Sequence, residues 1–127
     1  MMIERSITGL MLVVALIHLL PIVGVLGGER LSMLYGVAID DRNLAILMRH
    51  RALLFGILGG LFAYAAFVPA LQPVAFTAAA VSLAGLFWFA FSAGGYNEAI
   101  RKVVIADIVA TICLVLAVVL FLLRRPA

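Results

Sequence analysis

Four long runs of apolar residues, joined by short polar connections, limit this chain to very few folds. Each run is close to the roughly 20 residues that an α-helix needs to cross a hydrocarbon core of about 30 Å. Hydrophobic residues make up 67% of the 127 residues, more than a soluble domain of this size can bury. The sequence therefore predicts one all-α transmembrane domain over residues 1–127, a four-helix bundle with antiparallel up-and-down connections and helices over about residues 7–26, 44–67, 74–93 and 99–123.

The connections carry their own structural signals. Residues 30–35 predict a short helix in the membrane interface, stopped by Gly36, and Tyr35 suits that depth because its ring is apolar and its hydroxyl is polar. Asp40 or Asp41 can then cap the second long helix, as Asn97 can cap the fourth. The uncharged connection at residues 69–73 is short, so the second and third helices must form an antiparallel hairpin.

Small and helix-breaking residues inside the apolar runs predict how the helices pack. Pro21 removes a backbone hydrogen bond to the carbonyl of Ile17 and should bend the first helix just after His18. In the second helix, small residues recur at four-residue spacing, which lets another helix approach closely; they are Ala52, Gly56 and Gly60. In the third helix, Thr77 and Ser82 are expected to bond back to their own backbone and to have no function.

The charged residues indicate a lipid bilayer as partner and exclude nucleic acid. The formal net charge is +3, but the basic residues flank the apolar runs as membrane anchors do. Six basic residues lie on the side of the first and third connections and three on the opposite side, which places the former side in the cytoplasm. The N-terminal run is interpreted as an uncleaved first helix, and the lone Cys113 as a small core residue.

Asp107 is the most informative residue for function. It lies about five residues inside the fourth apolar run, roughly 6–7 Å below the membrane boundary. An ionised carboxylate at that depth costs several kcal/mol unless it is paired or hydrated. No basic residue lies on its face of the helix, so its partner must come from another helix. The alternating helix directions bring several polar residues to the same side of the membrane, namely Arg49, His50, Arg51, His18, Tyr96 and Asn97.

This one-sided polar cluster has several interpretations. In a purely structural role, Arg49 or Arg51 pairs with Asp107 and His18 bonds a backbone carbonyl. In a binding role, the cluster holds the head of an amphiphile, a lipid or a quinone, and two arginines would suit a phosphate or carboxylate. A haem between His18 and His50 requires facing imidazoles at matching depth, and His50 lies too near the surface for that.

No sequence pattern indicates catalysis or a metal site. The chain has no HExxH pattern, no Cys/His cluster, no glycine-rich phosphate loop and no nucleophile elbow. We therefore expect a non-enzymatic membrane protein, either an accessory subunit of a larger complex or a binder of an amphiphile. The alternative is a small homo-oligomeric, proton-coupled transporter in which Asp107 lines a cavity.

Several short motifs together resemble a family of small four-helix bacterial inner-membrane proteins that is loosely DoxX-like. The resemblance covers nearly the whole chain, implies a multi-pass protein of the bacterial inner membrane, and brings no established reaction. Proteins of this kind are sometimes labelled pantetheine-phosphate adenylyltransferase, but the chain lacks both the alternating strands and helices and the HxGH motif of that soluble enzyme. The motifs are His18-Leu19-Leu20-Pro21, Leu34-Tyr35-Gly36-Val37, Leu47-Met48-Arg49-His50-Arg51, Phe55-Gly56, Gly94-Gly95-Tyr96-Asn97 and Asp107.

Overall fold

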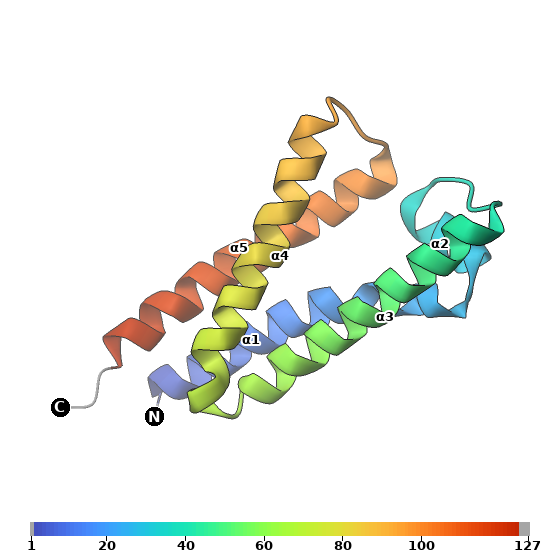
Figure 1. Ribbon diagram of the computed structural model, residues 1–127. Coiled ribbons are helices and arrows are strands. Elements are labelled where there is room, and N and C mark those ends of the chain that lie inside the picture. The colour runs from blue at the N-terminus through green and yellow to red at the C-terminus, as the bar shows by residue number, and fades with distance from the viewer. Residues whose placement is uncertain (1, 125–127) are drawn as a thin grey trace.

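Four long helices pack as a bundle, and a short helix lies between the first two (Figure 1). The computed structural model describes residues 2–124. The predicted all-α bundle and the predicted short helix in the first connection are both confirmed. In chain order the elements are α1 (Met2–Leu19), the 3-10 helix η1 (Leu20–Leu26), α2 (Gly28–Tyr35), α3 (Arg42–Ala65), the 3-10 helix η2 (Pro69–Leu71), α4 (Gln72–Ser92) and α5 (Glu98–Leu123).

By length and composition, this is a multi-pass membrane protein. Four segments are long and apolar enough to cross a bilayer: Met2–Leu26, Arg42–Ala65, Pro69–Ser92 and Glu98–Leu123. Only 17% to 28% of the most apolar stretch of each span is buried inside the protein, so most of its apolar side chains face outward. In water that surface would be strongly unfavourable, whereas a hydrocarbon solvent accepts it.

The helix ends follow from local chemistry. Where Pro21 removes a backbone donor, the α-helix stops at Leu19 and continues as the tighter η1, which agrees with the expected bend after His18. Gly36 ends α2 in the left-handed conformation (φ 66°). At the start of α3, Asp41 Oδ1 accepts a hydrogen bond from the Asn43 backbone N–H (3.0 Å), which resolves the choice between the two aspartates.

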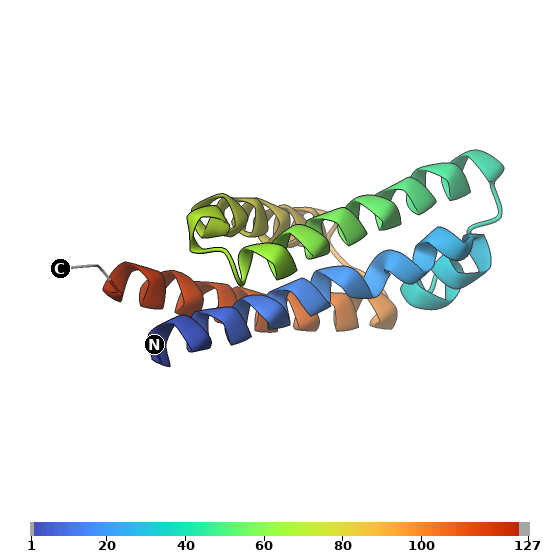
Figure 2. The same ribbon diagram turned by 90° about the horizontal axis from the view of Figure 1, so that it is seen from below.

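The main core lies where α1 packs between α3, α4 and α5. Its most deeply buried large side chains are Ile7 and Phe62, and small residues such as Ala110 and Ala117 let α5 approach α1 closely. A second, smaller core joins α2 to the starts of α3 and α5 through Leu31. The start of α1 and the end of α5 lie at the same end of the molecule, as four spans require (Figures 1 and 2).

The close approach of α3 to the first span uses Gly56, as expected, together with Gly59, which was not expected. A Cβ atom added at Gly59 would lie 2.6 Å from Leu19 Cγ, and one added at Gly56 would lie 2.5 Å from Ile22 Cδ1. At Gly60, a Cβ atom would meet nothing within 4 Å, so the prediction that Gly60 belongs to the packing face was wrong. Gly59 thus packs on α1 and Gly56 on η1, and α3 contacts both elements.

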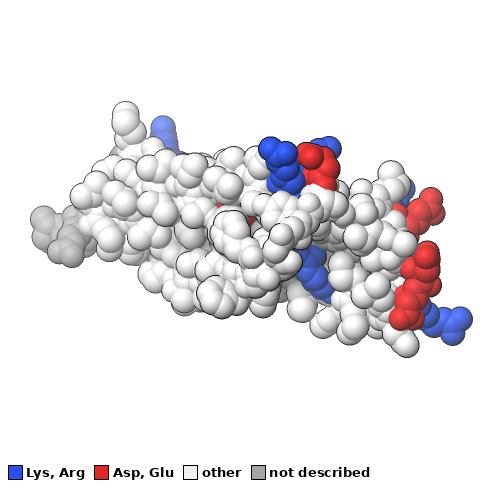
Figure 3. Space-filling view, turned by 90° about the horizontal axis from the view of Figure 1, so that it is seen from above, with Lys and Arg blue, Asp and Glu red and all other residues white. Residues whose placement is uncertain are grey.

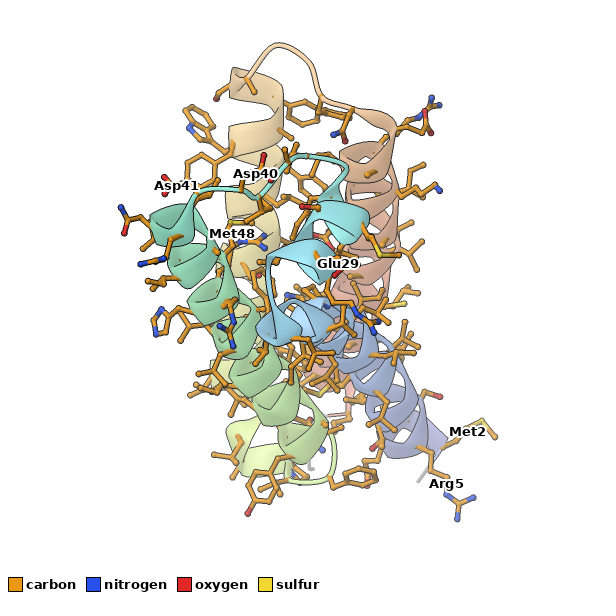
Figure 4. All side chains as sticks on the ribbon, turned by 90° about the vertical axis from the view of Figure 1, so that its right-hand side faces the viewer. Met2, Arg5, Glu29, Asp40, Asp41 and Met48 are labelled. Atoms are coloured by element: carbon orange, nitrogen blue, oxygen red, sulfur yellow. The ribbon has the colours of Figure 1, made fainter. Side chains whose placement is uncertain are left out.

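Charged side chains are distributed unevenly along the bundle. On the face seen in Figure 3, they lie mainly over the half of the molecule that contains the α2–α3 connection. Asp40 and Asp41 lie at the end opposite Met2 and Arg5 (Figure 4). The candidate site is in the half of the bundle nearer Asp40 and Asp41, where α3 and α5 begin.

Candidate functional site

Arg51 on α3 is held in a fixed position by aromatic side chains. Its Nη1 donates a hydrogen bond to the Tyr35 hydroxyl (2.6 Å). The guanidinium carbon lies 5.3 Å from the centre of the Tyr35 ring and 4.6 Å from the centre of the Phe55 ring. Cation–π contacts of this kind stabilise a cation where little water is available. The sequence assigned Tyr35 only to the membrane interface, but the structure makes it the direct partner of Arg51.

Asp107 on α5 is half-buried and lies within electrostatic range of Arg51. Its backbone carbonyl accepts a hydrogen bond from Thr111 Oγ1 (2.7 Å). Within residues 2–124, its carboxylate has no hydrogen bond and no ion pair. The expectation that a basic residue from another helix faces Asp107 agrees with this arrangement, whereas the expected closed ion pair is not formed. Arg51 and Asp107 therefore both keep hydrogen-bonding capacity.

His18 is buried (2% exposed) and joins α1 to α4. Its Nδ1 lies 3.0 Å from the Val14 carbonyl oxygen and its Nε2 lies 3.0 Å from Ser82 Oγ. A carbonyl only accepts, so Nδ1 carries a proton, and in the neutral ring Nε2 accepts from the Ser82 hydroxyl. The expected bond from His18 to a backbone carbonyl is present. The expectation that Ser82 bonds back to its own helix was wrong, although Thr77 does so, to the Pro73 carbonyl (2.9 Å).

These bonds bear on the haem interpretation. Both nitrogens of His18 are already engaged, so an iron atom would have to displace Val14 or Ser82. His50 is exposed, and within the described chain no group of three His, Cys, Asp or Glu side chains is arranged to hold a metal ion. The His18 ring instead packs against Phe55 (centroids 5.8 Å apart) and Phe62 (4.8 Å).

The other residues expected at the site lie around its edge. Arg49 is two residues from Arg51 and therefore points in a different direction around the helix. Its Nε donates to the Val25 carbonyl of η1 (2.8 Å). Tyr96 is 44% exposed. Asn97 does more than expected: its Oδ1 accepts from the Ile100 backbone N–H (2.8 Å), and its Nδ2 donates to the Tyr35 carbonyl (2.9 Å), which links the start of α5 to α2.

Two further features escaped the sequence analysis. Gln72, assigned to a connection, is buried at the start of α4 and donates from Nε2 to the Ala65 carbonyl (3.2 Å), satisfying the end of α3. An open groove of about 720 Å³ lies between α3 and α4 and is lined by Leu58, Pro73, Val74, Thr77, Ala78, Val81 and Ser82. Neither has a sequence signal, because both depend on how α4 is placed against α3.

The fold defines the class of protein: a four-span, α-helical membrane protein with a cluster of polar side chains in one half of the bundle. No protein-family model matches the chain, and no curated protein or solved structure matches it either. A function must therefore be argued from the site itself.

Proposed function

We propose that this protein binds a membrane amphiphile, a lipid or a quinone, whose polar head lies between Arg51 and Asp107. The supporting observation is that two opposite charges on different helices lie near each other without forming an ion pair. Charged residues within membrane spans are costly and are normally paired or hydrated. A bound polar head group that contacts both residues would remove this cost.

The available hydrogen-bonding groups define the chemistry of that head. Arg51 has only donors and needs an acceptor, such as a carbonyl, hydroxyl or phosphate oxygen. An ionised Asp107 has only acceptors and needs a donor, such as a hydroxyl or an ammonium group. The ligand must therefore present an acceptor and a donor a few ångströms apart. Arg49 faces the Val25 carbonyl instead, so the proposed site has one arginine and not two.

The site is also preorganised. Arg51 is oriented by the Tyr35 hydroxyl and by two aromatic rings before any ligand binds. Tyr35 is in turn held by Asn97, which connects α2 to the helix that carries Asp107. A head group binding here would not have to order these side chains, which favours affinity.

The test is native mass spectrometry of the purified full-length protein with extraction of bound small molecules. Wild type would be compared with Arg51→Gln, Asp107→Asn and a matched control, Arg49→Gln, which removes an exposed arginine from the same helix. We expect a specific bound amphiphile in wild type and in the control, and its loss in both site variants. Equal occupancy in all four proteins, or none in wild type, would reject the proposal.

Proton-coupled transport by a homo-oligomer is the second candidate. It is favoured by the same half-buried Asp107, because a carboxylate without an ion pair can exchange a proton. Below the site, however, the core where α1 meets the other helices is apolar, with Met11, Val14 and Phe62 among its members. Proteoliposomes with an internal pH dye would reveal an Asp107-dependent proton flux if the protein transports protons. An accessory subunit of a larger complex would bind the amphiphile at this site and would show no proton flux.

We further propose a bacterial inner membrane as the location, on the basis of the family resemblance and the basic residues around the spans. Six basic residues, among them Arg49 and Arg51, lie on the side of the proposed site, against three on the side of the termini. This difference favours a cytoplasmic location for the site. Cysteine labelling of Ala99→Cys in intact and in opened cells would test that orientation.

A further inference from the structure

The groove between α3 and α4 is suited to a hydrocarbon chain. Figure 1 shows that α4 starts beside the end of α3 and diverges from it along its length. The lining of the groove contains two hydroxyl groups, and both are engaged: Thr77 bonds to the Pro73 carbonyl and Ser82 bonds to His18. The rest of the lining is apolar. The volume of the groove, about 720 Å³, falls within the range of known small-molecule sites, roughly 300–1,000 Å³.

A chain of side-chain contacts connects this groove to the charged pair. Ser82 at one end of the groove contacts His18 (3.0 Å), and the His18 ring stacks on Phe55 (5.8 Å). Phe55 in turn lies under the guanidinium of Arg51 (4.6 Å). These contacts place Arg51 and the Ser82 end of the groove in neighbouring parts of the bundle, separated by Phe55 and the buried His18.

The position of the groove sets the length of the tail. Leu58 lies seven residues after Arg51, about 10 Å farther along α3, and Gln72, next to Pro73 at the far end of the groove, bonds to the Ala65 carbonyl, 14 residues and about 21 Å from Arg51 along α3. A tail that fills the groove would thus run roughly 21 Å from the charged pair, whereas one leaflet provides only about 15 Å of hydrocarbon. Such a tail passes the bilayer midplane.

We infer that the groove holds the polyprenyl tail of a quinone or its quinol, an inference that rests on the proposed function. A long polyprenyl chain can cross the midplane, whereas an ordinary phospholipid chain stays in its own leaflet. The charges of Arg51 and Asp107 oppose each other, so a neutral head fits better than a phosphate, which Asp107 would repel. One ring oxygen accepts from Arg51, and in the quinol a hydroxyl at the opposite edge of the ring donates to Asp107.

The experiment measures binding of two quinols with the same ring, one with a long polyprenyl tail and one with a single prenyl unit. The full-length protein would be reconstituted in nanodiscs of one defined phospholipid. Val81→Trp fills the groove, because Val81 lines it and is 68% exposed. Val115→Trp is the matched control: Val115 is 54% exposed on α5 and is not part of the groove lining. Circular dichroism would verify that both variants keep their helices.

We expect wild type and Val115→Trp to bind the long-tailed quinol at least tenfold more tightly than the short one, and Val81→Trp to lose that preference. If both quinols bind equally and Arg51→Gln weakens both, the proposed binding site between Arg51 and Asp107 stands and the groove inference is overturned. If no quinol binds, the groove inference is overturned. The comparison of the amphiphiles extracted from wild type and from Asp107→Asn then decides whether the proposed binding site between Arg51 and Asp107 stands. Tighter binding of a polyprenyl phosphate than of the quinols would overturn the assignment of a neutral head.

Discussion

Replacing Gly59 by alanine tests the packing of α3 against the first span, on which the position of Arg51 depends. The new methyl group would lie 2.6 Å from Leu19 Cγ and 3.1 Å from the Ala15 carbonyl oxygen, so α1 and α3 would have to move apart. Overpacking of this kind costs about 1–3 kcal/mol. Gly60→Ala provides the comparison, because it makes the same chemical change in the same helix where a Cβ atom meets nothing within 4 Å.

Both substitutions gain about 1 kcal/mol of helix propensity, so that contribution cancels in the comparison. We expect Gly60→Ala to be neutral or up to about 1 kcal/mol more stable than wild type, and Gly59→Ala to be about 1–3 kcal/mol less stable than Gly60→Ala. The assay is equilibrium unfolding in mixed detergent micelles, followed by far-ultraviolet circular dichroism. Equal stability of the two variants would refute the close approach of α1 and α3.

Three further substitutions, one of them with a control, test the site and its supports. Ser82→Ala should destabilise the protein by about 0.5–1 kcal/mol, the usual size of an interhelical hydrogen bond in a membrane, as measured by the same unfolding assay. Asn97→Ala should cost about 0.5–2 kcal/mol as a lost cap and also speed proteolysis of the α2–α3 connection, whereas Asp41→Ala should show only the cap effect, because of these two capping residues only Asn97 bonds to α2. Tyr35→Phe should weaken amphiphile binding severalfold in titrations without unfolding the protein, because Arg51 loses a hydrogen bond but keeps its ring contacts.

Much of the fold could be predicted because the membrane imposes it. Four apolar runs of spanning length leave an α-helical bundle as the main solution, and local signals set the ends of elements, as Gly36 and Asp41 show. Which glycines pack could not be read from a four-residue spacing. Gly59 meets the first span at Ala15 and Leu19, whereas Gly60, one residue farther on, meets nothing within 4 Å, and the spacing alone does not show which of the two faces that span.

The site was only partly predictable for a similar reason. Depth along each helix can be counted from the sequence, which placed Asp107, Arg51 and His18 in the same half of the membrane. The direction of each side chain depends on how the helices are rotated against one another. That rotation brings Val25 onto Arg49 and Tyr35 onto Arg51, and it joins His18 to Ser82. None of these pairings has a sequence pattern of its own.

The most direct test of the binding proposal is an experimental density map of the protein purified in its native lipids. We expect a head group between α3 and α5, within hydrogen-bonding distance of both the Arg51 guanidinium and the Asp107 carboxylate. A direct ion pair between these two side chains, with nothing bound between them, would contradict the proposal and make Asp107 a fastener of the bundle.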